Sequence, residues 1–163
     1  MKLEEAILQS SFKSEAQKAG INIIYTANWL QNCMQDFLNK FQITHQQYNV
    51  LRILKGSYPT SLSTCDIRRR MLDKMSDVSR IVDRLVKQGL VTRKINLADK
   101  RLIDVQISEN GLSLLTDIEK EQNKMEEIMK VLTEQELEML NEFLDRLRIA
   151  NANCNKQKDS HFE

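Results

Sequence analysis

Charged and hydroxyl side chains recur on one side of the segment KMSDVSRIVDRLVKQG, residues 74–89. At about 100° per residue, a helix would gather them on one arc: Ser76, Asp77, Ser79, Arg80, Asp83, Arg84 and Lys87. The opposite arc would be apolar and would carry Met75, Val78, Ile81, Val82, Leu85 and Val86. A guanidinium group can donate two hydrogen bonds to guanine or bind phosphate, so this helix is a candidate reader of nucleic acid.

Each polar side chain of this segment also has a structural explanation. Arg80 and Arg84 could contact bases or phosphates, or they could form ion pairs with Asp77 or Asp83. Serines at a helix start can serve DNA or cap the helix, and Ser76 and Ser79 fit both descriptions. Asp77 could accept from cytosine N4, but we favour the helix dipole as the reason for an acid in the first turn.

A second candidate is the loop in NLADKRLIDVQIS, residues 96–108, where Asp99, Lys100 and Arg101 crowd together. Apolar residues alternate with polar ones after the loop, and LVTRKI precedes it, so two short strands should form a β-hairpin around a charged tip. The simplest explanation of such a tip is a solvated turn.

The two halves of the chain differ in charge. Residues 66–101 contain eleven Lys and Arg against five Asp and Glu, whereas residues 109–149 contain five against eleven. Such segregation suggests a module that faces a polyanion, carried on an acidic helical scaffold. Unequal solvated faces would give the same sums.

The rest of the chain predicts a mostly α protein, because only four glycines and one proline interrupt its 163 residues. Apolar spacing predicts a long helix over residues 19–41, one helix from Ser108 through Met129, and a last helix up to about Leu147. Local signals place further helix boundaries: Thr44 with Gln47, Gly56 with Pro59, Ser63 with Asp66, Gly89, and Thr133 with Glu136. The exposed stripes of the first and last helices require a partner surface, which predicts a homodimer.

Several function classes find no support in the sequence. Cys33, Cys65 and Cys154 are far apart, and the two histidines have no cysteine near them, so neither a disulfide framework nor a zinc site is expected. No nucleotide-binding glycine loop or nucleophile motif occurs, and we expect no enzyme activity and no cofactor. Without a leader or an apolar stretch of about 20 residues, the protein should be soluble and cytoplasmic.

The predicted order of helix, turn, helix and hairpin is that of a winged helix-turn-helix. Within it, residues 76–111 resemble the MarR family of bacterial transcription regulators. The family pattern is matched by Arg84, Leu85, Lys87, Gly89, Leu90, Val91 and Arg93, then Asp99 and Arg101, then Val105, Ile107, Ser108 and Gly111. The resemblance covers about residues 19–149 and is weakest in DIRRRMLDKM, where Arg68 replaces a small residue and Leu72 stands near a usual glycine.

This resemblance implies a DNA-binding regulator, most simply a homodimeric repressor of a pseudo-palindromic operator that a small-molecule effector releases. Residues 1–42 and 108–152 would form the helical dimerisation region, 43–107 the winged helix-turn-helix, and 153–163 a flexible tail. In the wing, Asp99 would steady Arg101, and Arg101 would enter the minor groove.

Further contacts are expected under the same interpretation. Phosphates would be bound by Ser63, Thr64, Lys74, Lys87 and Arg93. The pocket for an aromatic effector would be lined by Tyr25, Trp29 and Tyr48, although aromatic residues at helical spacing usually belong to a core. Two alternatives stay open: a winged helix that binds an acidic protein, and a redox sensor that uses Cys33 or Cys65.

Overall fold

The computed structural model describes residues 1–96, 103–121 and 124–159, with side chains at 1–96, 103–121 and 126–149. The chain divides into two compact units, Met1–Lys124 and Met125–Glu163. Its elements are α1 (Leu3–Ala6), α2 (Glu15–Asn39), α3 (His45–Lys55), β1 (Leu62–Ser63), α4 (Thr64–Arg70), α5 (Val78–Lys87), β2 (Val91–Ile95), β3 (Ile103–Ile107), α6 (Glu109–Lys120), α7 (Lys124–Met129) and α8 (Glu134–Asp159).

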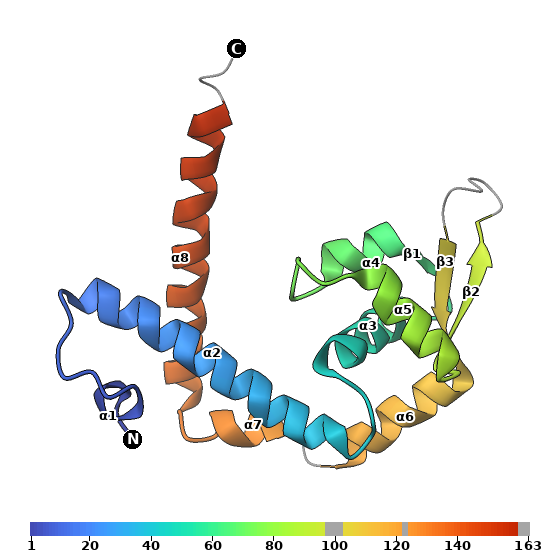
Figure 1. Ribbon diagram of the computed structural model, residues 1–163, viewed down its shortest axis with the longest axis horizontal. Helices are drawn as coiled ribbons and strands as arrows, with labels where there is room; N and C mark the ends of the chain where they lie inside the picture. Colours follow the sequence, from blue (N-terminus) through green and yellow to red (C-terminus); the bar gives the residue numbers. More distant parts are fainter. Residues whose placement is uncertain (97–102, 122–123, 160–163) are drawn as a thin grey trace. The chain divides into compact units, whose positions relative to one another are not determined.

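The order α3, α4, α5 and then β2 and β3 confirms the predicted winged helix-turn-helix (Figure 1). Strands β2 and β3 are antiparallel, with Val91 opposite Ile107 and Ile95 opposite Ile103. The predicted two-stranded hairpin was incomplete, because β1 pairs with the other side of β3 and makes the sheet order β1-β3-β2. A strand of two residues is too short to show alternation in the sequence.

The apolar side of α5 packs into the core of the first unit, as predicted. Val78, Ile81, Val82 and Leu85 are all buried, and Val86 is partly buried against them. The core is completed by buried side chains of the other elements, among them Leu38, Val50, Leu51, Leu54, Ile67, Met71, Val105, Ile107, Leu115 and Ile118. Met75 was wrongly placed on this arc: α5 begins at Val78, and Met75 lies before it with 92% of its surface exposed.

The predicted helix starts at Thr44, Ser63, Ser108 and Thr133 are confirmed. Thr44 and Gln47 form a reciprocal capping box at α3, and Ser63 and Ser108 accept backbone N–H groups at α4 and α6. Thr133 and Glu136 cap each other in the same way before α8. Gly56 caps the end of α3, and Gly89 takes the left-handed conformation after α5 with φ of 71°.

Two helix predictions need correction. The long first helix spans Glu15–Asn39, so it starts earlier than predicted and leaves Phe41 beyond its end. The single helix expected from Ser108 to Met129 is interrupted, because Glu121 is extended with ψ of 130° after α6 and α7 starts at Lys124. Helix α8 continues to Asp159, beyond the apolar stripe that predicted it.

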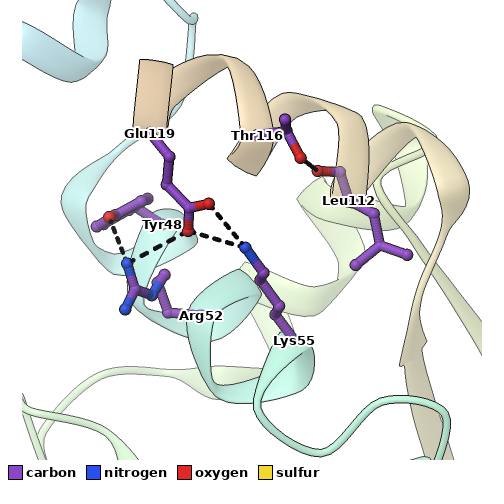
Figure 2. A network of polar contacts seen from close by, with 6 residues as sticks. All are labelled: Tyr48, Arg52, Lys55, Leu112, Thr116 and Glu119. Atoms are coloured by element: carbon purple, nitrogen blue, oxygen red, sulfur yellow. Dashed lines mark hydrogen bonds and ion pairs between the residues drawn. The ribbon is translucent and has the colours of Figure 1, made fainter. Parts of the chain in front are cut away.

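Polar contacts join α6 to α3 on the surface of the first unit (Figure 2). The Glu119 carboxylate of α6 accepts from Lys55 Nζ at 2.8 and 2.9 Å and lies 3.7 Å from Arg52 NH1. Arg52 also donates to the Tyr48 hydroxyl at 3.3 Å. Nearby, Lys40 at the end of α2 binds Glu121 at 2.8 Å, so both α2 and α3 hold the last turn of α6.

Candidate nucleic-acid interface

The candidate interface is centred on the polar side of α5. Asp77 is the N-cap of this helix, and its carboxylate accepts from the Arg80 backbone N–H at 3.2 Å. The other carboxylate oxygen lies 3.3 Å from Arg80 Nε, whose side chain is 81% exposed. Asp77 therefore caps the helix instead of lying in its first turn, where the sequence analysis had placed it, and Arg80 carries the predicted ion pair while remaining accessible to a ligand.

Beyond Arg80, α5 presents cationic and hydroxyl groups without internal partners. The side chains of Ser79, Arg84 and Lys87 are exposed and make no hydrogen bond or ion pair with another described residue. Because the opposite side of the helix is buried, these groups face solvent from a rigid support. Their chemistry suits bases, which accept or donate hydrogen bonds at their edges, and phosphates.

Ser76 takes a role that was not foreseen. Its hydroxyl donates to Asp73 at 2.8 Å, so it belongs to the turn before α5 and does not cap the helix. The same carboxylate accepts from the Met75 backbone N–H at 2.9 Å. Both bonds hold the pKa of Asp73 below its ordinary range, and the bond from Ser76 has the larger effect.

A hollow of about 300 Å³ lies between the starts of α3 and α5. It is lined by Thr44, Gln46, Gln47, Asp73, Ser76, Asp77, Arg80, Ile81 and Arg84. Sequence reasoning missed the contribution of α3, because residues 44–47 are separated from α5 along the chain. Burial lowers the pKa of His45, while the nearby Asp73 opposes this shift.

An ion pair connects α5 to the sheet. Arg93 of β2 donates a hydrogen bond to Asp83 of α5, and both side chains are about half exposed. The sequence suggested Asp83 as an ion-pair partner for Arg80 or Arg84, but in the structure Asp83 pairs with Arg93. The sequence showed the two opposite charges, yet only the fold brings them together.

The other predicted phosphate ligands fall into two groups. The Ser63 hydroxyl donates to Asp66 at 2.6 Å and accepts from its backbone N–H at 3.1 Å, which lowers the pKa of Asp66. Lys74 donates to the carbonyl of Arg69. Thr64, by contrast, is partly buried at the start of α4 and has no hydrogen-bond partner among the described side chains.

The wing residues Asp99, Lys100 and Arg101 lie outside the described residues. The strands that support them are described, and Asn96 Nδ2 at the end of β2 donates to both carboxylate oxygens of Asp104 at 3.0 and 3.1 Å. Lys94 of β2 is exposed and adds a cation that the sequence analysis did not select.

The structure does not gather the three aromatic residues of the expected effector pocket into one enclosed site. Tyr25 and Trp29 are exposed on α2, whereas Tyr48 of α3 packs partly against the core. Cys33 is partly buried, and Cys65 is exposed on α4. Neither thiol is bonded to another cysteine within the described part of the chain.

Other kinds of site were also sought. No cluster of three or more His, Cys, Asp or Glu side chains that could hold a metal ion occurs among the described residues. The described helices include none with the length and apolar character needed to cross a membrane.

Comparison with known proteins decides the family. The sequence model of the MarR family matches residues 43–103, which contain α3, α4, α5 and the wing. The chain is 31% identical over 117 residues to the HTH-type transcriptional regulator MhqR of Bacillus subtilis, covering 70% of this chain and 78% of MhqR. This chain belongs to the MarR family.

Further MarR relatives agree in sequence and fold. The HTH-type transcriptional repressor IacR of Pseudomonas putida is 31% identical over 125 residues, or 74% of this chain and 69% of IacR. A MarR transcription factor from Planctomyces limnophilus is 29% identical with a TM-score of 0.64, covering 83% and 98% of the two chains. A mutant MarR from E. coli in complex with operator DNA has a TM-score of 0.74 at 23% identity, with 85% and 99% covered.

Membership of the MarR family makes the chain a DNA-binding transcription regulator. Its ligand is double-stranded DNA. The members of this family are transcription regulators and not enzymes.

Proposed function

We propose that this MarR-family chain is a homodimeric repressor that acts in the cytoplasm, binds a pseudo-palindromic operator and releases it when a small-molecule effector binds. The observation that carries the proposal is the two-sided character of α5. Its apolar side is buried in the core, while Arg80, Arg84 and Lys87 are exposed on the other side. A major groove about 12 Å wide admits one helix of this kind.

Residue roles follow from the contacts of α5. The side chains of Arg84 and Ser79 have no internal partner in the described chain, so they are ready to bind a base edge or a phosphate. Arg80 would contact a base while keeping or exchanging its contact with Asp77. Ser76 and Asp77 would support the helix start, and Lys87 would bind phosphate.

The flanking residues would position the protein on the DNA backbone. Thr64 and Lys74 are near the start of α4 and before α5, and Ser63 would bind phosphate only by giving up a contact with Asp66. The wing residues Asp99, Lys100 and Arg101 would reach the adjacent minor groove, and Arg93 would hold the wing strand against α5.

A second copy of the chain would bind the second half-site of the operator. Helix α8 exposes Met139, Leu140, Phe143, Leu147 and Ile149, and α2 exposes Ile23, Ile24, Tyr25 and Trp29. Exposed apolar surface of this extent usually marks an interface. Residues 1–42 and 108–152 would form the dimerisation region, in keeping with the two-fold symmetry of a pseudo-palindrome.

Repression is the simplest action of such a dimer, because a protein seated on a promoter excludes other proteins. Similarity to IacR, which is named a repressor, supports this direction. The effector would bind near Tyr25, Trp29 and Tyr48 once the dimer encloses the exposed aromatic side chains of α2.

The test uses the full chain. Light scattering should give twice the monomer mass at micromolar concentration, and genomic DNA recovered with the protein should contain one two-fold repeated motif. A stable folded monomer would contradict the dimer. Equal affinity for the recovered motif and for random duplex DNA would contradict sequence-specific regulation.

A further inference from the structure

The turn between α4 and α5 exposes two large apolar side chains. Leu72 is 75% exposed and Met75 is 92% exposed, whereas the neighbouring Met71 is 1% exposed and fills the core. The turn therefore already has its core residue. Leu72 and Met75, called here the apolar tip, are left in water beside the candidate interface.

The apolar tip is held in place by hydrogen bonds of the turn. The Leu72 backbone N–H donates to Asn49 Oδ1 of α3 at 3.0 Å, and the Met75 backbone N–H donates to Asp73 Oδ1 at 2.9 Å. Ser76 adds a bond from its hydroxyl to the same Asp73 carboxylate. A turn fixed on both sides presents these side chains with little further loss of backbone freedom on binding.

The surroundings of the apolar tip identify its ligand. Arg69 and Arg70 end α4, Lys74 lies inside the turn, and Arg80 follows in the first turn of α5. The two acids of this stretch are already bonded within it, Asp73 to Ser76 and Asp77 to Arg80. In helix-turn-helix proteins, residues at the N-terminal end of the recognition helix contact base edges. An apolar group among cations at this place is suited to the apolar group that bases display in the major groove, the C5 methyl of thymine.

We propose that the apolar tip is a specificity-determining element, in which Met75 contacts the C5 methyl of a thymine in each half-site and Leu72 packs beside it. This inference rests on the proposed placement of α5 in the major groove. Met75 suits this role because its unbranched, polarisable side chain adapts to an irregular surface. It reads a methyl group, so it selects thymine independently of the hydrogen bonds made by Arg80 and Arg84.

The experiment removes only the methyl group. The preferred operator is first selected by the full chain from random duplexes, and each thymine of one half-site is then replaced by deoxyuridine, which keeps the base-pairing groups. The wild type should lose affinity about two- to fourfold at one thymine, or at two adjacent ones, as expected for one buried methyl group. Met75→Ala should bind the thymine and uracil operators equally at that position.

Two control variants make the result decisive. Met75→Leu should keep the preference for thymine, and Leu8→Ala should also keep it, because Leu8 is 94% exposed in the segment after α1. A structural effect of Met75→Ala would weaken both operators alike and leave their ratio unchanged. That outcome overturns the proposal, as does a wild type that never distinguishes thymine from uracil.

Failure of the proposed function and failure of the thymine contact give different results. If the full chain selects no sequence at all, both the operator-binding role of α5 and the thymine contact are wrong. If it selects an operator but the thymine-to-uracil ratio survives Met75→Ala, only the role of the apolar tip is wrong.

Discussion

Lys55 Nζ of α3 lies 2.8 and 2.9 Å from the two carboxylate oxygens of Glu119 in α6 (Figure 2). This contact fixes the last turn of α6 on the helix-turn-helix, with Arg52 at 3.7 Å as a second cation. The Lys55 ammonium is also the main reason that the pKa of Glu119 lies below its ordinary value.

Replacing Glu119 by Gln should lower the free energy of unfolding by about 0.2–1 kcal/mol, the usual contribution of an exposed ion pair. The difference should be present at neutral pH. It should shrink as the pH falls below about 4.5, the ordinary pKa of a glutamate. It should vanish once the pH is below the lowered pKa of Glu119 in the folded protein, because protonated Glu119 no longer pairs with Lys55. Urea unfolding at pH 7 and pH 3.5, at low and high salt, measures it.

The matched control for this prediction is Asp117→Asn. Asp117 pairs with Lys120 at 2.9 Å within α6 and joins no second helix. An equal, pH-independent loss in both variants would mean that the contact between Glu119 and Lys55 contributes nothing specific to the packing of α6.

Gly111→Ala should destabilise the protein by about 1–3 kcal/mol. A Cβ at this position would lie 2.3 Å from the Leu90 carbonyl oxygen and 2.8 Å from Ile107 Cγ1, where α6 leaves the sheet. Gly20→Ala is the control, since a Cβ there meets nothing within 4 Å and alanine favours the helix by about 0.5–1 kcal/mol. Thermal unfolding of both variants tests the prediction, and an unchanged melting temperature for Gly111→Ala would refute it.

Much of the fold could be predicted because its signals are local. The capping pair of Thr44 and Gln47, the left-handed Gly89 and the buried side of α5 each depend on a few neighbouring residues. The start of α5 was misjudged because Met75, three residues before Val78, fits the helical spacing of the apolar arc. The carboxylate of Asp73 fixes a turn there, and no periodicity reports such a turn.

Non-local features were the ones that could not be predicted. Strand β1 exists through its pairing with β3, and Arg93 meets Asp83 only after the sheet packs beside α5. The break after Lys120 was missed because Ile118 and Met125 are seven residues apart, which is about two helical turns, although no apolar residue stands between them. At the candidate interface, the exposed position of Arg84 followed from the helical wheel, whereas the partners of Ser63, Ser76 and Lys74 did not.

Arg80→Ala should weaken binding to the operator by about 1–3 kcal/mol and binding to random duplex DNA by much less. The reason is the direct base contact proposed for its guanidinium, which is 81% exposed beside Asp77. Lys120→Ala is the control, because Lys120 is also exposed and paired with an acid on its own helix, but in α6. Fluorescence anisotropy with both DNAs measures the losses, and equal losses would reassign Arg80 to a phosphate.

Asp83→Ala should weaken operator binding about two- to fivefold, although it removes a negative charge near the DNA. Asp83 holds Arg93 of β2 against α5, and an exposed ion pair contributes up to about 1 kcal/mol. The exchanged pair, Asp83→Arg with Arg93→Asp, should recover part of the loss. Tighter binding by Asp83→Ala would show that its charge only repels DNA, and Asp117→Ala, distant in α6, controls for net charge.

The last prediction concerns Asp99 and Arg101 of the wing. If only net charge mattered, removing Asp99 would strengthen operator binding, whereas its role in positioning Arg101 predicts weaker binding. Arg101→Ala should weaken operator binding and reduce the salt slope by roughly 0.9 for each phosphate interaction lost, because a guanidinium is attracted to a narrow A·T-rich minor groove. Asp99→Ala should also weaken binding, since an unsupported Arg101 must be ordered on the DNA at a cost of up to about 2 kcal/mol. Titrations of both variants at several salt concentrations decide between the two descriptions. Tighter binding by Asp99→Ala, or unchanged binding by Arg101→Ala, would leave the loop as a solvated turn.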